Sequence, residues 1–356
     1  MGARIAVCVG MSWWKRRRIA DFLAADAPVF RRSVAGALKA AAARGGGIGV
    51  WATREPAGLA AAAAAHGIPL VRIEDGFIRS VGLGSDFRPP ASLVFDEVGI
   101  YFNPRRESGL ERLLRETEFD PALLARARRL VDRLVAGGVT KYNLAAGHHR
   151  IDWPPDRRRI LVPGQVEGDL SVRLGGAGIT GNLDLLSRVR AVNPGAFILY
   201  KPHPDVAAGH RKGAIPVRAA RRYADAIVAR GSIAALLGEI DELYTLTSLA
   251  GFEALLRGVP VTVYGRPFYA GWGLTADLAM PPRGRTLSLE ELAAGALILY
   301  PRYLDPLTCQ PCGPEIIVER LAQPELWRPG LVVRARRVQG VAIELLRSCA
   351  PRFARR

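Results

Sequence analysis

The amino-acid sequence predicts an α/β protein made of two successive doubly wound domains, and three observations lead to this prediction. Short apolar runs alternate with helical patterns, and alternation of this kind indicates parallel sheets. The alternation stops near residue 141 and restarts near residue 160. With 356 residues and 49% hydrophobic content, the chain can bury two cores. We therefore expect domains over residues 1–150 and 151–330, followed by a basic helix or tail over residues 331–356.

In the first half, the elements are predicted in the order βαβαβ. Strands are expected at residues 5–9, 48–51 and 70–73, with shorter strand-like pieces at 93–95 and 100–102. Helices are expected at residues 15–25, 57–66, 109–116 and 121–136. Residues 141–156 contain a Trp-Pro-Pro and several charged residues, which is typical of a connection between domains.

The second half repeats the pattern. Strands are expected at residues 160–162, 197–200, 242–246 and 259–264, and helices at 182–192, 223–230 and 248–257. Further helices are expected at residues 289–299, 315–321 and 338–348. Because both sheets would present the carboxyl ends of their strands to the space between them, a cleft between the domains is the expected binding site.

The charge balance indicates an anionic partner. The chain has 50 Lys and Arg against 33 Asp and Glu, a net charge of +17, which is compatible with nucleic acid, anionic lipid or phosphorylated substrates and equally with a solvated basic surface. No apolar run reaches the roughly 18 residues of a spanning helix, so membrane contact would be peripheral. Four cysteines are too few for a disulfide framework and fit a reducing compartment. Cys309 and Cys312 have zinc-knuckle spacing but lack a second ligand pair, so we expect no metal there.

Two motifs in the second half suit a phosphate. Lys201-Pro-His203-Pro follows the run at 197–200, and its prolines fix an ammonium and an imidazole at the end of a strand. Thr247 and Ser248 precede the helix at 248–257, where free amides and the helix dipole favour anions, although a plain N-cap explains them as well.

Acidic residues follow strands in both halves. Glu74 and Asp75 close the strand at 70–73, with Arg79 close behind, so they could serve as a general acid and base or form a simple capping turn. Asp169 ends a glycine-rich loop that leaves the strand at 160–162. This loop has neither the spacing of a dinucleotide-binding motif nor that of a P-loop, which argues against NAD and ATP.

Read together, seven ordered segments resemble one family, the capsular polysaccharide Kdo transferases of the KpsC/LipB type. These segments are EDGFIRSVGLGSD at 74–86, PPASLVFDEVGIYFNP at 89–104, PGQVEGDLS at 163–171, YKPHPDV at 200–206, TSLAGFEALLRG at 247–258, YGRPFYAGWGLT at 264–275 and YPRYLDP at 300–306. Family members usually carry two related modules in tandem. This chain holds one, and its PGQVE loop is similar to the carboxyl-terminal module.

The resemblance implies a GT-B-like fold and a retaining transferase. Such an enzyme would move the acidic ketosugar Kdo from CMP-β-Kdo to a Kdo-terminated (lyso)phosphatidylglycerol, building the β-Kdo linker of bacterial capsule. The carboxyl-terminal likeness favours a β-2,7 over a 2,4 linkage. A peripheral position on the inner face of the inner membrane, an anionic membrane surface and a possible partner transferase module are also implied, whereas nucleic acid is not.

The resemblance also assigns roles to residues. Lys201, His203, Thr247 and Ser248, together with Gln165 and Glu253, would bind CMP. Retention of a charged ketosugar is commonly explained by double displacement, so Asp169 is the expected nucleophile, while Glu74 or Asp75 is the expected acid/base. Arg79 would meet the carboxylate of Kdo, and no metal or other cofactor is required. The alternative is a non-catalytic module that binds anionic lipid or polysaccharide during capsule assembly or export.

Overall fold

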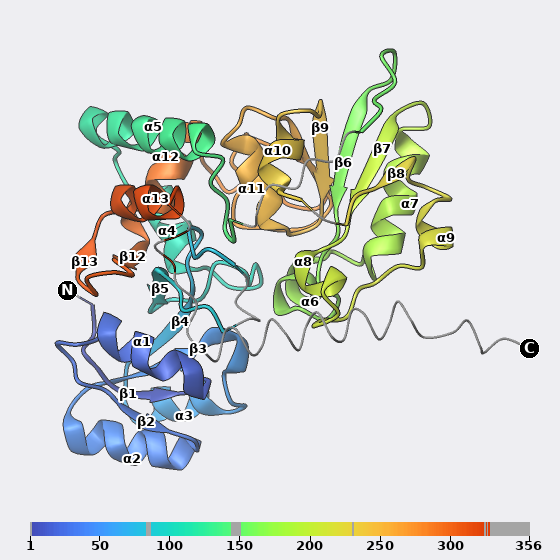
Figure 1. The fold of residues 1–356 in the computed structure, drawn as a ribbon. Coiled ribbons are helices and arrows are strands. Elements are labelled where there is room, and N and C mark those ends of the chain that lie inside the picture. Colours follow the sequence, from blue (N-terminus) through green and yellow to red (C-terminus); the bar gives the residue numbers. More distant parts are fainter. Residues whose placement is uncertain are drawn as a thin grey trace, which may run out of the picture.

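The computed structural model describes residues 2–82, 87–143, 151–229, 231–323, 325 and 327. They form two β-sheets with helices packed around them, which confirms the predicted α/β class and its two-sheet arrangement (Figure 1). The predicted helix at 338–348 and the predicted tail over 331–356 lie outside the described residues.

The first sheet is mixed and has seven strands. In spatial order they are β13 (Pro311–Cys312), β12 (Pro301–Leu304), β5 (Ser92–Asp96), β4 (Leu70–Asp75), β3 (Gly47–Trp51), β1 (Ile5–Val9) and β2 (Val29–Arg31). Strands β2, β1, β3 and β4 pair in parallel, whereas β5, β12 and β13 add antiparallel pairs. Residues 100–102, predicted as a strand-like piece, form no strand.

The second sheet has six parallel strands. Their order is β11 (Ala276–Asp277), β10 (Val261–Val263), β9 (Glu242–Thr245), β6 (Arg159–Pro163), β7 (Phe197–Lys201) and β8 (Ala226–Ile227). The chain winds from β6 toward one edge and from β9 toward the other, so the direction of winding reverses between these two strands. Ligands of doubly wound sheets bind outside the carboxyl ends of the strands at such a point.

One predicted helix of the second half, at residues 223–230, is wrong. Its alanine-rich sequence favours a helix, but Ala226 and Ile227 instead pair with β7 as the edge strand β8. The carboxylate of Asp225 fixes this edge, because it accepts the backbone N–H of Ile198 at 2.8 Å and pairs with Arg190. These contacts join segments far apart in the sequence, so local helix propensity does not report them.

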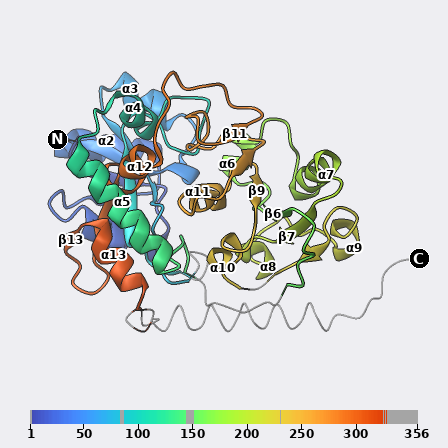
Figure 2. The same cartoon turned by 90° about the horizontal axis from the view of Figure 1, so that it is seen from above.

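The helices cover both sheets. They are α1 (Arg16–Phe22), α2 (Val34–Arg44), α3 (Leu59–Ala65), α4 (Gly109–Glu116), α5 (Pro121–Ala136), α6 (Leu170–Gly175), α7 (Asn182–Val192), α8 (Pro204–Ala207), α9 (Val217–Ala220), α10 (Ile233–Leu237), α11 (Leu249–Leu255), α12 (Leu289–Ala293) and α13 (Pro314–Leu321). Helices α12 and α13 pack against α5, as Figures 1 and 2 show. Within the described part of the chain, no helix has the length and apolar character needed to span a bilayer.

The chain returns to the first sheet after completing the second. Strand β12 pairs antiparallel with β5, and β13 follows it as a hairpin. Arg18 of α1 secures this return by donating to the carbonyl oxygens of Pro90 and Leu304 at 3.0 and 2.7 Å. Residues 301–312, which the sequence analysis places in the domain of residues 151–330, therefore pair with the sheet of the first half.

Aromatic side chains join the two halves of the molecule. Phe77, which follows β4, stacks on Phe268 of the second half with ring centroids 4.5 Å apart. Phe252 of α11 packs against Phe268 at 5.2 Å, and the same buried cluster includes Val94 of the first sheet and Leu243 of the second. One continuous core thus fixes the position of one sheet relative to the other.

Candidate functional site

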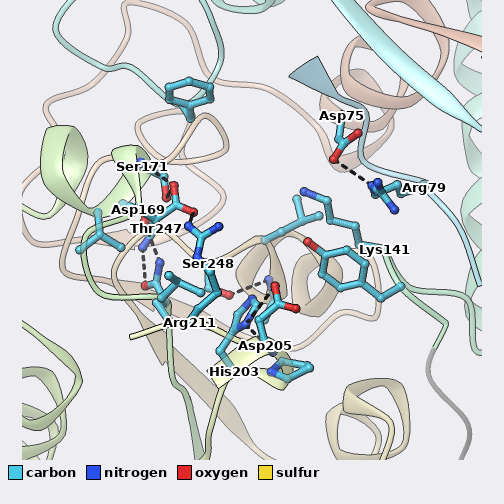
Figure 3. Close-up of a pocket in the computed structure, with 18 of the residues that line it drawn as sticks. Asp75, Arg79, Lys141, Asp169, Ser171, His203, Asp205, Arg211, Thr247 and Ser248 are labelled. Carbon is cyan, nitrogen blue, oxygen red and sulfur yellow. Dashed lines mark hydrogen bonds and ion pairs between the residues drawn. The ribbon is translucent and has the colours of Figure 1, made fainter. Parts of the chain in front are cut away.

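A cleft of about 780 Å³ lies between the two sheets and is lined by residues of both halves. All ten residues that the sequence analysis selects line this cleft: Glu74, Asp75, Arg79, Gln165, Asp169, Lys201, His203, Thr247, Ser248 and Glu253. Figure 3 shows Asp75 and Arg79 on one side, and Asp169, His203, Thr247 and Ser248 on the other. The topology explains this convergence, because the loops after β4, β6, β7 and β9 all open toward the same space.

The loops after β6 and β9 are joined by a pair of hydrogen bonds at the point where the winding reverses. Gln165 donates from Nε2 to the hydroxyl of Thr247 at 2.8 Å and accepts the N–H of Thr247 through Oε1 at 3.0 Å. The backbone of Gln165 is held in turn by Asn182, whose Oδ1 accepts from its N–H at 2.7 Å. Gln165, predicted to bind CMP, thus also positions Thr247.

The Lys-Pro-His-Pro turn places two side chains at the carboxyl end of β7. His203 caps α8 by accepting the N–H of Asp205 at Nδ1, at 3.1 Å, and burial lowers the pKa of its imidazole. In the neutral ring the proton is therefore assigned to Nε2, which makes that atom a donor suited to a phosphate oxygen. Lys201 donates from Nζ to the carbonyl of Gly231 at 2.9 Å, and burial lowers its pKa to about 8.

Asp169 caps the first turn of α6 and faces the cleft. One oxygen, Oδ1, accepts the N–H of Ser171 at 3.2 Å, and the other lies 3.6 Å from the guanidinium of Arg211. Its side chain is 39% exposed, so an incoming ligand can reach it. The preceding residue, Gly168, has a φ of +86°, in the left-handed region that favours glycine. Arg211 was not selected from the sequence because its pairing with Asp169 joins two separate loops.

The adjacent acids of β4 have opposite electrostatic environments. Burial raises the pKa of Glu74 to about 7. Burial acts in the same sense on Asp75, but Arg79 at 2.8 Å and Lys15 at 3.5 Å outweigh it and hold the pKa of Asp75 well below its usual range. Of the two acids, Glu74 can thus exchange a proton near neutral pH, whereas Asp75 stays ionised.

Arg79 is committed to protein partners. Its side chain has no exposed surface, its Nε pairs with Asp75, and its two terminal nitrogens donate to the hydroxyl of Ser80 at 2.8 Å and the carbonyl of Arg88 at 3.0 Å. The structure therefore gives Arg79 a contact that positions Asp75. Because the Arg79 side chain has no exposed surface, the predicted contact with the sugar carboxylate would require the residues that cover it to move.

Lys15, Trp51 and Thr53 belong to the first-half wall but were not selected from the sequence. Sheet winding also reverses between β1 and β3. Trp51 and Thr53 lie at and just beyond the end of β3, whereas Lys15 ends the short helical turn that follows β1. The ammonium of Lys15 lies 3.3 Å from the centroid of the Trp51 ring, and Thr53 donates its N–H to Glu74 at 3.4 Å. Trp51 and Thr53 could be predicted from their position at the end of β3, whereas Lys15 is placed by its contacts with Trp51 and Asp75.

Glu253 is buried in α11 and connects this helix to the crossover between the halves. Its Oε1 accepts the backbone N–H of Lys141 at 2.8 Å, and burial raises the pKa of its carboxyl group. The contact supports a positioning role for Glu253, whereas its predicted contact with CMP stays a prediction. Within the described ranges, no group of three or more His, Cys, Asp or Glu side chains could hold a metal ion.

The start of α11 depends on a close approach at Gly251. A methyl group at this position would overlap the hydroxyl of Tyr269 and lie 2.7 Å from its Cζ, and that hydroxyl donates to the carbonyl of Ser248 at 2.5 Å. We expect Gly251→Ala to destabilise the protein by about 1–3 kcal/mol, because the buried Tyr269 ring must shift to make room for the methyl group. The free energy of unfolding is measured by chemical denaturation. The matched control is Gly195→Ala, where an added methyl group meets no atom within 4 Å. Equal stability of the two variants would contradict the prediction.

This chain matches one protein family and is similar to proteins of two bacteria. The family model described as capsule polysaccharide biosynthesis protein matches residues 47–143 and 120–303. The capsule polysaccharide modification protein LipA of Neisseria meningitidis serogroup A is 46% identical over 319 residues, which are 88% of this chain and 45% of LipA. The lipopolysaccharide-processing protein LpsZ of Rhizobium meliloti is 48% identical over 241 residues, 66% of this chain and 54% of LpsZ. The chain thus spans about half the length of the curated relatives it matches.

Two solved structures match nearly the whole chain. The β-Kdo 2,7 transferase of Thermosulfurimonas dismutans KpsC has a TM-score of 0.72 and 34% identity, covering 90% of this chain and 99% of that one. The β-Kdo 2,4 transferase of the same KpsC has a TM-score of 0.76 and 33% identity, covering 90% and 98%. The predicted GT-B-like fold is confirmed by these matches, which do not discriminate between the two linkages.

Proposed function

Because this chain belongs to the capsule polysaccharide biosynthesis protein family, we propose that it is a retaining glycosyltransferase acting on Kdo in the assembly of bacterial capsule. The donor would be CMP-β-Kdo and the acceptor a Kdo-terminated (lyso)phosphatidylglycerol. The observation that carries the proposal is the cleft itself, where a reachable carboxylate on one wall faces a pair of acids with opposite pKa shifts on the other.

In the proposed first step, Asp169 attacks the anomeric carbon of the donor sugar. The bond from that carbon to the phosphate oxygen breaks, and its electron pair leaves with CMP. His203 and Lys201 at the end of β7, with Thr247 and Ser248 after β9, would stabilise the charge on the departing phosphate. CMP whose phosphate charge is stabilised in this way needs no proton in order to leave.

In the second step, a hydroxyl of the acceptor attacks the same carbon and displaces Asp169. Glu74 takes the proton of that hydroxyl, since its pKa of about 7 allows it to act as a base at neutral pH. Two inversions at one carbon give net retention. Asp75, kept ionised by Arg79 and Lys15, would stabilise positive charge developing on the sugar.

The proposed activity can be tested with the purified chain, CMP-β-Kdo and synthetic acceptors that end in Kdo. We expect release of CMP to depend on the acceptor, and we expect NMR of the product to show a β-linked Kdo. The β-2,7 linkage remains a prediction, and acceptors that offer only O4 or only O7 distinguish it from 2,4. Binding to anionic vesicles without acceptor-dependent CMP release would support the non-catalytic module instead, and would leave membrane association as the main activity.

A further inference from the structure

The proposed donor carries a sugar carboxylate, and the structure offers a different cation for it than Arg79. The guanidinium of Arg79 has no exposed surface and already contacts Asp75, Ser80 and Arg88, so a ligand carboxylate cannot reach it in this arrangement. An ionised carboxylate entering a partly dehydrated cleft nevertheless needs a compensating charge. Other cations also line the cleft.

Several of these cations are already engaged. The ammonium of Lys15 lies against the Trp51 ring and 3.5 Å from Asp75. Lys201 donates to the carbonyl of Gly231, and Arg211 pairs with Asp169. Each of these three cations thus has a protein partner. The charge of Lys15 is directed at Asp75 and not at open space in the cleft.

Lys141 differs from these three cations, because its backbone is held by both halves of the protein and its ammonium has no carboxylate partner among the described residues. Its backbone N–H donates to Glu253 of the second half at 2.8 Å, and its carbonyl accepts the N–H of Ser80 of the first half at 3.3 Å. The side chain is fixed at its base by both halves. The predicted connection between domains is thus, at this residue, part of the wall of the cleft.

The side chain of Lys141 extends toward the middle of the pocket, between Asp75 on one side and His203 on the other (Figure 3). Among the described residues, no carboxylate lies within ion-pair distance of its ammonium, which lies 5.6 Å from the centroid of the Tyr142 ring. Its charge nevertheless acts on Glu74 and Asp75 of the first half and on His203 of the second. It therefore lies in the region where the proposed phosphate and acid/base sites meet.

We propose that the ammonium of Lys141 binds the carboxylate of the donor sugar and so selects acidic sugars over neutral ones. This inference rests on the proposed function. On a ketosugar acid, the carboxylate is attached directly to the anomeric carbon that Asp169 would attack. A cation placed between the phosphate site and the base can hold that carboxylate without neutralising the nucleophile, which has Arg211 as its own partner.

The test compares equilibrium binding of CMP and CMP-β-Kdo, in an Asp169→Asn background that prevents turnover. We expect Lys141→Met to weaken binding of CMP-β-Kdo by about 10- to 100-fold and to change CMP affinity less than threefold. Lys141→Arg should retain most of the affinity for CMP-β-Kdo, because the cation remains. Lys39→Met, on the exposed face of α2, is the matched control and should bind both ligands normally. Thermal melting of each variant separates a folding defect from a binding defect.

The outcomes distinguish this inference from the proposed function. If the Asp169→Asn protein binds neither ligand, the proposed function fails and the inference with it. If that protein binds both ligands but Lys141→Met lowers both affinities equally, Lys141 contacts the phosphate and the inference alone is overturned. An unchanged affinity for CMP-β-Kdo in Lys141→Met would also overturn it.

Discussion

Replacing Asp169 by asparagine is expected to lower sugar transfer by roughly 10³-fold or more while leaving CMP affinity nearly unchanged. Asparagine is the sharpest substitution because Asp169 also caps α6, and Asn caps a helix about as well as Asp. The variant thus removes the nucleophile but keeps the local fold. The measurement is the initial rate of CMP release at saturating acceptor, with CMP binding measured in parallel.

The proposed covalent intermediate on Asp169 can also be detected directly. With donor present and acceptor absent, mass spectrometry should find a sugar adduct in the wild-type protein and none in Asp169→Asn. The control is Asp184→Asn, which alters a carboxylate on α7 that pairs with Arg188 and does not line the cleft. Transfer at the wild-type rate by Asp169→Asn would exclude Asp169 as the nucleophile.

Replacing Glu74 by glutamine is expected to reduce transfer by about 10²- to 10⁴-fold, the range typical of a lost general base. The proposed base acts as a carboxylate, and its pKa is raised to about 7. Wild-type activity should therefore rise as the pH increases from about 5 to 8, because Glu74 loses its proton over this range. In Glu74→Gln, this rise with pH should disappear along with most of the activity.

The Glu74 prediction has a control on an exposed helix. Glu116→Gln changes a carboxylate of α4 that is 58% exposed, and it should leave both rate and pH profile unaltered.

Asp75→Asn tests the other acid. Because it leaves the buried Arg79 without its ionic partner, a loss of stability on the order of 3–5 kcal/mol is expected, and unfolding must be measured with activity. If Glu74→Gln kept the wild-type pH profile while well-folded Asp75→Asn lost it, the base would be Asp75.

Much of the site could be predicted from sequence because the relevant signals are local. Each predicted residue near His203, Thr247 or Asp169 follows an apolar run, and the end of a parallel strand fixes which edge of the sheet it occupies. The sequence also showed Glu74 and Asp75 as a pair. The sequence could not show which of the two exchanges a proton near neutral pH, because their pKa values depend on burial and on the positions of Arg79 and Lys15.

The remaining features depend on contacts between distant segments. Lys15 reads as part of a basic cluster until Trp51 and Asp75 are placed beside it. Lys141 reads as a linker residue until Glu253 and Ser80 fix its backbone. The predicted helix at 223–230 failed for the same reason, since pairing with β7 overrides local propensity.

The return of β12 and β13 to the first sheet also defines how this protein can be divided for experiments. A gene fragment ending near residue 150 would encode a first sheet whose strand β5 lacks its neighbour, and a fragment starting there would carry β12 and β13 without β5. Each fragment would expose an unpaired strand edge, which favours aggregation. A protease cut between residues 151 and 156 has a different consequence, because the two pieces remain interlocked through the hairpin and helices α12 and α13. Such a nicked protein should migrate as one particle in gel filtration and separate only in denaturant.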